Sequence, residues 1–284
     1  MYNKTDMHMH SCYSEDGEYS PGELVQMCSD EGISVMAVSD HNTVAGVAEA
    51  IEKAGQLRLQ CHPAIEVDCI YEGINFHVLG YDIEYTSKDF LDIERNIRKQ
   101  CARTSRERLV LINKLGFSLE EEDLNRAVSG SYWNEYWTGD IFAEVLLNKS
   151  EYMKSELLRP YRAGGARSDN PYVNFYWDYC SQGKQCYAEI IFPDMQEVIK
   201  IIHGNGGKAV LAHPGNNLRD RFEMVDSIIN LGLDGLEAFS SYHDADTTEW
   251  FYKKAQDKGL LVTGGSDFHG KTKPSIKLGQ YYRL

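Results

Sequence analysis

The sequence lacks a long apolar run. No stretch of it approaches the roughly 18 consecutive apolar residues that a membrane-spanning helix requires. Residues 1–6 contain no apolar segment of the kind that a signal peptide needs. We therefore expect a protein that has no membrane partner.

Paired cysteines are also missing. The seven cysteines are scattered, their number is odd, and no two of them form a C-x-x-C motif. This pattern argues against both a disulfide framework and a zinc ribbon. Scattered thiols are typical of a reducing compartment, so we expect a cytoplasmic location.

Positive charge is scarce, since 29 Lys and Arg stand against 43 Asp and Glu and the formal net charge is −14. Such an acidic chain is a poor match for long nucleic acids. An anionic substrate would therefore need a local source of positive charge other than Lys and Arg. Hydrophobic residues make up 42% of the chain, which is enough for a sizeable core and too much for a disordered chain.

Strand and helix patterns alternate at both ends of the chain. The predicted strands outside the hairpin described below cover residues 4–10, 33–38, 208–212, 235–239 and 260–264. Residues 20–23, Ser-Pro-Gly-Glu, are typical of a helix start with a capping box. Repeated βα units without a Gly-x-Gly-x-x-Gly fingerprint favour a barrel over a dinucleotide-binding sheet.

Residues 86–188 break this alternation. They contain two or three helical stretches and a segment rich in Tyr and Trp, and no Pro/Gly/Ser-rich linker flanks them. We therefore predict one barrel domain built from residues 1–85 and 189–284, with residues 86–188 inserted as a helical lid subdomain. Because active sites of such barrels lie at the C-terminal ends of the strands, we expect this lid to cover the barrel mouth.

Histidines gather where the predicted strands end. Six of the nine lie at or beside such ends: His8, His10, His41, His77, His213 and His269. Alternate residues of a strand share a face, so His8 and His10 can bind one metal ion. Asp267 and His269 repeat this spacing after the last strand. If the barrel closes, the first and last strands are neighbours and both pairs face one point.

A predicted hairpin adds a carboxylate and an imidazole. Two apolar segments flank residues 72–73, Glu-Gly, which is typical of a two-residue turn. In that register Glu66 and His77 lie diagonally on one face, about 5 to 8 Å apart. A carboxylate in an apolar strand needs a cation. Asp16, in an acidic loop near the first strand, completes the candidate metal ligands.

These residues resemble the motifs of the PHP (polymerase and histidinol phosphatase) family. Six matching motifs occur in the family's order, namely His8-x-His10-Ser11, Ser39-Asp40-His41, Ile65-Glu66, His77-x-Leu79-Gly80-Tyr81, Ala212-His213-Pro214 and Gly265-Ser266-Asp267-Phe268-His269. Six motifs are a more specific signal than one alone, and they cover the chain apart from the insertion. The resemblance implies an α/β fold, a distorted (β/α)7 barrel with two or three divalent metal ions.

The resemblance also implies how the ligands are shared. One ion would take His8, His10, Glu66 and Asp267, a second would take the bridging Glu66 with His77 and His213, and a third would take Asp16, His41 and His269. Imidazole nitrogens and carboxylate oxygens without a thiolate suit Mn, Fe or Zn. Such ions would make the pocket cationic inside an acidic protein.

The expected activity is hydrolysis of a phosphomonoester by metal-bound hydroxide. Asp267 or His269 could handle the proton of the leaving oxygen. The insertion resembles that of phosphoesterases acting on nucleotides, including 3′,5′-bisphosphates, so we expect a small phosphorylated substrate, a nucleotide or a nucleoside bisphosphate. The alternatives are an amidohydrolase-type C–N hydrolase, an exonuclease acting on oligonucleotide 5′ ends, and a regulatory module with a residual metal site.

The substrate contacts are less well defined by the sequence. The resemblance implies an arginine that grips phosphate near a helix similar to residues 138–142, but this chain has no arginine there. Arg167 could replace it, and so could Arg103 within the basic run between residues 95 and 108. The alternative for that run is a solvated helix face paired with nearby Glu residues. His243, after a predicted strand, is a third candidate for a substrate contact.

Overall fold

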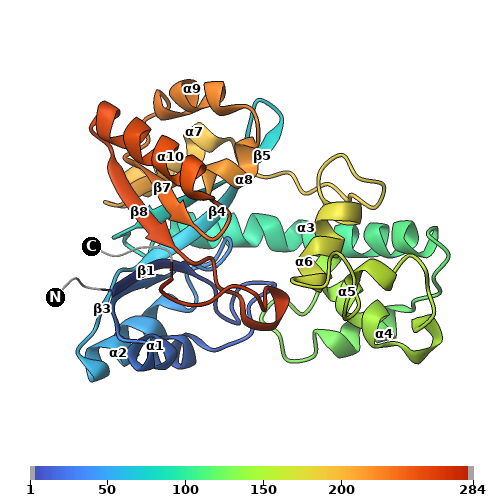
Figure 1. The fold of residues 1–284 in the computed structure, drawn as a ribbon. Helices are drawn as coiled ribbons and strands as arrows, with labels where there is room; N and C mark the ends of the chain where they lie inside the picture. The colour runs from blue at the N-terminus through green and yellow to red at the C-terminus, as the bar shows by residue number, and fades with distance from the viewer. Residues whose placement is uncertain (1–3, 281–284) are drawn as a thin grey trace.

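The computed structural model describes residues 4–280, so the ends of the two predicted barrel segments, 1–3 and 281–284, lie outside the described residues. Two sheets organise the chain (Figure 1). The three-stranded sheet contains β1 (Lys4–Met9), β2 (Ile33–Val38) and β3 (Gln60–Cys61). The five-stranded sheet contains β4 (Ala64–Tyr71), β5 (Ile74–Tyr81), β6 (Lys208–Leu211), β7 (Gly235–Ser240) and β8 (Leu261–Gly265).

The two sheets meet where their strands end. On one side the Asp267 N–H donates to the His8 carbonyl at 2.8 Å, which joins the segment after β8 to β1. On the other side the Asn42 N–H donates to the Glu66 carbonyl at 2.7 Å, which joins the segment after β2 to β4. The predicted proximity of the first and last strands is therefore confirmed at this end. As a result, residues from both ends of the chain face one region.

Strands β4 and β5 form the predicted antiparallel hairpin. Glu66 pairs with Leu79, as a two-residue turn at residues 72–73 requires. Glu72 and Gly73 have φ angles of 48° and 75°, and positive φ at both central residues is the mark of a tight hairpin turn that matches the strand twist. This register places the side chains of Glu66 and His77 on the same face.

Helices cover the outer faces of the sheets. α1 (Pro21–Asp30) begins with the predicted capping box, in which Ser20 Oγ accepts from the Glu23 N–H. The other helices around the sheets are α2 (Val47–Leu57), α7 (Met195–Gly204), α8 (Pro214–Leu218), α9 (Val225–Ile229) and α10 (Ala245–Lys258), with short 3-10 turns η4 (Phe222–Met224) and η5 (Gly270–Thr272). The segment before β7 thus consists of the 3-10 turn η4 followed directly by the short α9.

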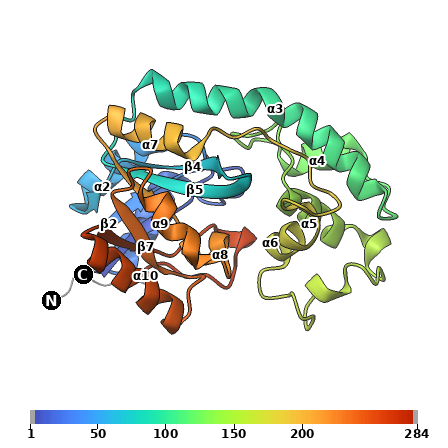
Figure 2. The ribbon, with the colours of Figure 1, turned by 90° about the horizontal axis from the view of Figure 1, so that it is seen from above.

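Residues 86–188 are helical and have a hydrophobic core of their own, which includes Phe142 and Phe175. Figure 2 shows α3 running from the strands to the group of α4, α5 and α6. The elements are α3 (Lys88–Asn113), α4 (Glu121–Ala127), α5 (Gly139–Asn148), η1 (Ser150–Tyr152), η2 (Arg159–Tyr161), α6 (Pro171–Phe175) and the π-turn η3 (Tyr176–Cys180). Several aromatic side chains of the Tyr/Trp-rich segment pack in or against this core, which explains their abundance.

Two sequence expectations concern the chain as a whole. Within residues 4–280, no helix combines the length and the apolar character that crossing a bilayer requires. None of the seven cysteines forms a disulfide bond, as their scatter along the sequence predicts.

The close approach of β8 to β1 requires glycine at position 265. A Cβ added there would lie 2.5 Å from the backbone nitrogen of His8 and closer still to its Cβ. We expect Gly265→Ala to lower the free energy of unfolding by about 1–3 kcal/mol, measured by urea denaturation, because the strands must separate. Gly55→Ala is the matched control, since a Cβ there meets nothing within 4 Å inside α2. It should raise stability by about 0.5–1 kcal/mol, and a similar gain for Gly265→Ala would contradict the tight contact.

Candidate metal centre

All nine predicted metal ligands converge at the region where the strands end. They come from β1, the loop after it, the segment after β2, the β4–β5 hairpin, and the segments after β6 and β8: His8, His10, Asp16, His41, Glu66, His77, His213, Asp267 and His269. Most of them are buried. The topology therefore brings together side chains that are separated by most of the sequence.

One group consists of His8, His10, Glu66 and Asp267, all of which are buried. The Nε2 atoms of the two histidines lie 3.1 Å apart, and each lies 3.1 Å from Glu66 Oε2. Asp267 Oδ1 lies 3.3 and 3.1 Å from the same two nitrogens. Ligands bound to one ion at about 2.0–2.2 Å are separated by about 3 Å or slightly more, so this spacing fits a single metal ion.

Two further groups adjoin the first. His10, Asp16, His41 and His269 form one of them, and His41, Glu66 and His77 form the other. His213 also belongs here, because its Nε2 lies 3.1 Å from Glu66 Oε1, while His77 Nδ1 lies 3.0 Å from the same oxygen. The second oxygen of Glu66 faces His8 and His10, so this carboxylate lies between two groups of ligands.

Several polar atoms in this region are buried without a hydrogen-bond partner. They are Asp16 Oδ1, His41 Nδ1, Glu66 Oε2, Asp267 Oδ1 and His269 Nε2. Buried polar atoms are normally satisfied, and each one left unsatisfied costs free energy. Metal cations would satisfy all five, and the nitrogen and oxygen donor set is one that Mn, Fe and Zn accept. The residues present therefore fit a metal centre.

The electrostatics of the ligands also favour a cation. Burial lowers the pKa of His10, but hydrogen bonds and charges from Asp267 and Glu66 outweigh it and raise the pKa to about 9. For His41, burial dominates and lowers the pKa to about 4. The carboxylates thus hold a proton on His10 wherever no metal replaces it, and metal binding must release that proton.

Glu237 orients the ring of His8 and holds the backbone of His213. Its Oε1 lies 3.0 Å from His8 Nδ1, and its Oε2 accepts from the backbone N–H of His213 at 2.7 Å. Ser14 does the same for His10, since its Oγ lies 2.9 Å from Nδ1 of that ring. Sequence reasoning missed both residues. For Glu237 a signal was available, because a carboxylate in the apolar strand Gly235–Ser240 needs a partner, as Glu66 does.

A buried cation holds the outer oxygen of Asp267. Lys273 Nζ and the Tyr242 hydroxyl each donate to Asp267 Oδ2 at 2.6 Å, which leaves Oδ1 facing the histidines. Lys273 is only 6% exposed. It lies beyond the last matched motif, and lysines at such positions are usually solvated, so no pattern in the sequence selects it.

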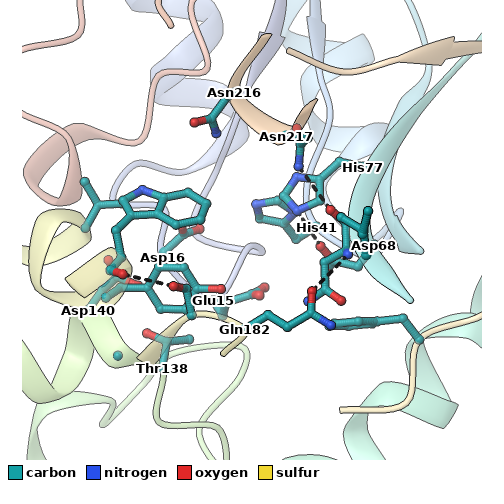
Figure 3. A pocket seen from close by; sticks show the side chains of 18 of the residues that line it. Glu15, Asp16, His41, Asp68, His77, Thr138, Asp140, Gln182, Asn216 and Asn217 are labelled. Carbon is teal, nitrogen blue, oxygen red and sulfur yellow. Dashed lines mark hydrogen bonds and ion pairs between the residues drawn. The ribbon is translucent and has the colours of Figure 1, made fainter. Parts of the chain in front are cut away.

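A cavity of about 260 Å³ opens beside the ligands. Asp16, His41 and His77 line it together with residues of the inserted segment, including Asp140 and Trp177. Figure 3 shows His41 and His77 on one side of this cavity and Asp140 on the other. The inserted helices therefore supply one wall of the space into which the ligand cluster opens.

The arginines selected from the sequence do not line this cavity. Arg103 pairs with Glu107 at 3.1 Å on the exposed face of α3, and Arg167 pairs with Asp178 at 3.0 Å. For Arg103 the alternative interpretation, a solvated helix face with neighbouring carboxylates, describes what the structure shows. Arg108, from the same basic run, does line the cavity.

His243 is likewise absent from the cavity lining. Its Nε2 accepts from the Gly215 N–H at 2.9 Å, and its Nδ1 lies 2.8 Å from the Ala238 carbonyl. A Cβ on Gly215 would lie 2.7 Å from this ring, so the packing is tight. His243 therefore braces the loop that follows His213 and does not reach a substrate in this arrangement.

A buried cluster of imidazoles and carboxylates beside a cavity at the strand ends defines a metal-dependent hydrolase. Residues 6–203 match the model of the PHP domain, and the chain belongs to this family. Like the members of its family and its named relatives, the chain is a metal-dependent phosphoesterase.

Curated relatives align with nearly the whole chain at 26% identity. One is a 5′-3′ exoribonuclease of Haemophilus influenzae, matched over 95% of this chain and 91% of its own length. A phosphoribosyl 1,2-cyclic phosphate 1,2-diphosphodiesterase of Eggerthella lenta is matched over 94% of both chains. A 3′,5′-nucleoside bisphosphate phosphatase of Chromobacterium violaceum is matched over 93% of this chain and 86% of its own.

Solved structures share the fold. A protein from Bifidobacterium adolescentis, named as a metal-dependent phosphoesterase, is 28% identical with a TM-score of 0.79, covering 98% of this chain and 92% of its own. A protein from Chromobacterium violaceum, named as an amidohydrolase and solved with sulfate and no metal, is 22% identical with a TM-score of 0.80, covering 99% and 92%. The second likeness concerns the fold alone.

We expect His10→Ala and Asp267→Ala to lose bound metal and phosphoesterase activity while the fold stays largely intact. Both side chains contribute donor atoms to the first group, and neither contributes to a hydrophobic core. Elemental analysis, turnover at saturating metal and circular dichroism would measure the three properties. His62→Ala is the control, because His62 pairs with Asp82 away from the cluster. Wild-type turnover in either ligand variant would show that the centre is wrongly assigned.

Glu237→Gln should weaken metal binding without abolishing it. The amide keeps the shape of the side chain but loses the charge that orients His8, and loss of such an outer partner typically costs about 10–100-fold in metal affinity or activity. A metal titration of the metal-free protein would measure the change. Glu197→Gln, on α7, should leave the affinity unchanged. Equal affinities of Glu237→Gln and wild type would argue against the orienting role.

Proposed function

We propose that this enzyme hydrolyses a phosphomonoester of a small substrate, a nucleotide or a nucleoside bisphosphate. The observation that carries the proposal is the cavity that joins the ligand cluster to the inserted aromatic wall. A phosphate at the ligands would leave the rest of the molecule against Tyr136, Tyr176 and Trp177. Aromatic side chains of this kind stack on nucleobases, each contact contributing about 1–3 kcal/mol.

We further propose two or three divalent ions, of Mn, Fe or Zn, held in the sets that the family resemblance implies. The first set is His8, His10, Glu66 and Asp267, the second is Glu66, His77 and His213, and the third is Asp16, His41 and His269. Bound ions would supply Lewis acidity and lower the pKa of a water nucleophile towards neutrality. The position of Glu66 between ligand groups supports its bridging role.

The acid–base assignment follows from the hydrogen bonds. Burial opposes ionisation of Asp267, but Lys273 and the surrounding histidines lower its pKa well below the usual range. Asp267 is therefore ionised and can accept a hydrogen bond from water. His269 Nδ1 lies 2.8 Å from the Asp267 carbonyl and so carries the hydrogen. Its Nε2 then presents a lone pair, which favours His269 as a ligand over His269 as a proton donor.

The fold proposal follows the same resemblance. We propose that the two sheets form one distorted PHP-type barrel, since backbone hydrogen bonds join them at two places. We also propose that residues 86–188 are an inserted lid subdomain, because they contain a hydrophobic cluster of their own and several of their side chains line the cavity.

Exonuclease action at 5′ ends is the second candidate function. It is favoured by the likeness to a 5′-3′ exoribonuclease over nearly the full length of both chains. Two observations favour the small substrate: the net charge of −14 disfavours a long polyanion, and the cavity of about 260 Å³ is small. A C–N hydrolase has support only from a likeness in fold.

Phosphate release from a substrate panel tests these functions. We expect activity on p-nitrophenyl phosphate and nucleoside 3′,5′-bisphosphates with added Mn, Fe or Zn, and its loss after chelation. A 5′-phosphorylated oligonucleotide tests the exonuclease alternative, and a cyclic amide tests the C–N hydrolase alternative. Stronger hydrolysis of the oligonucleotide would favour the exonuclease, and hydrolysis of the amide alone would overturn the phosphoesterase proposal. The His10→Ala variant controls for contaminating phosphatases.

A further inference from the structure

Three arginines line the cavity without a carboxylate partner. Arg108, Arg219 and Arg221 all contribute to its walls. Within residues 4–280 none of them forms an ion pair, although other arginines such as Arg98 and Arg167 pair with neighbouring acids. In a chain with 43 acidic residues, three unpaired guanidinium groups around one cavity indicate an anion that is not part of the protein.

Arg108 is the buried member of this set. It is only 3% exposed, its Nη1 donates to the Trp137 carbonyl at 2.5 Å, and its Nε has no hydrogen-bond partner. The ring of Tyr136 lies 5.9 Å from the guanidinium carbon. A buried cation that meets a neutral carbonyl and a tyrosine side chain, but no carboxylate within ion-pair distance, is poorly compensated. An anion in the cavity would complete its surroundings.

Arg219 and Arg221 approach from the other part of the fold. They follow α8, the short helix that begins directly after the predicted ligand His213. Arg219 has φ 55° and ψ −105°, a conformation that side-chain-bearing residues rarely adopt, and its guanidinium has no partner in the described chain. Arg221 donates only to the carbonyls of Leu218 and Asn217, at 3.4 and 3.5 Å. Strained residues that persist in a structure are concentrated at functional sites.

The carboxylates that line the cavity form no ion pair with these arginines. Asp16 and Asp68 lie with the histidines, at 3.2 Å from His269 and 2.9 Å from His77. Glu15 and Asp140 also line the cavity. Burial raises the pKa of both carboxyl groups, that of Asp140 to about 7 although the charge of Arg108 acts against it. The cavity is thus divided into a part with metal ligands and a part with free guanidinium groups. Planar guanidinium groups bind phosphate through paired hydrogen bonds.

We propose that Arg108, Arg219 and Arg221 bind a second phosphate group of the substrate, which stays intact while the first is hydrolysed at the metal centre. This inference rests on the proposed phosphoesterase function. The second phosphate belongs either to a nucleoside bisphosphate or to the 5′ end of an oligonucleotide whose first linkage is hydrolysed at the metal centre. Both sources present the same chemistry, a phosphate one ribose away from the scissile group. The arginines would therefore select substrates with two phosphates.

The test compares substrates that differ by one phosphate. We expect the wild-type enzyme to show at least about tenfold higher kcat/KM for adenosine 3′,5′-bisphosphate than for adenosine 3′- or 5′-monophosphate. In the Arg219→Gln/Arg221→Gln variant this ratio should fall at least about tenfold, chiefly through KM. Arg108→Gln should act in the same direction. Comparing kcat/KM for the dinucleotide pApA with that for the bisphosphate distinguishes an oligonucleotide substrate from a nucleoside bisphosphate.

Arg126→Gln is the matched control, because Arg126 is exposed on α4, makes no ion pair in the described chain and does not line the cavity. It should leave the ratio unchanged. The double variant replaces partly or fully exposed residues, so it remains informative if Arg108→Gln fails to fold. A wild-type enzyme without preference for the second phosphate, or a double variant with an unchanged ratio, would overturn the proposal.

A failure of the phosphoesterase function gives a different result. In that case the wild-type protein would release no phosphate from any compound, including p-nitrophenyl phosphate. Calorimetric titration with adenosine 3′,5′-bisphosphate and with the monophosphates would still test the arginines. Tighter binding of the bisphosphate, lost in the double variant, would support the anion site even then. Equal binding of mono- and bisphosphate would overturn it.

Discussion

The structure depends on one buried carboxylate, that of Glu66. Five imidazoles lie within about 3 Å of its two oxygens: His8, His10, His41, His77 and His213. A buried carboxylate among imidazoles is unfavourable unless cations balance its negative charge and hydrogen-bond donors or metal ions satisfy both of its oxygens. The strand pairings, the hairpin register and the junctions between the sheets all serve to bring these groups together, and the metal-dependent chemistry follows from that.

Much of this site could be predicted from the sequence, because its ligands follow rules of local geometry. The spacing of His8 and His10 and the hairpin register of Glu66 depend only on strand periodicity and turn length. The groups that orient the ligands were harder to find. Lys273 and Ser14 belong to loops. Tertiary packing decides which loop residues point inward, and no periodic pattern in the sequence predicts that packing.

The arginines also show that the sequence does not reveal which side chains face the cavity. Along the sequence Arg103 and Arg108 are equivalent members of one basic run, yet α3 turns Arg103 towards Glu107 and Arg108 towards the cavity. Arg108 lies beside the Tyr136 ring and donates to the Trp137 carbonyl, whereas Arg103 is exposed. For Arg219, position along the chain carries no signal, because no sequence pattern marks the rare backbone conformation that this residue adopts.

The origin of the ligands at both ends of the chain bears on how the protein is made. β1 emerges from the ribosome long before Asp267 and His269, which follow β8. The complete set of ligands therefore cannot assemble until the segment after β8 has been synthesised. Nascent chains that end before this segment would hold metal weakly, and tight loading would mark chains that contain it.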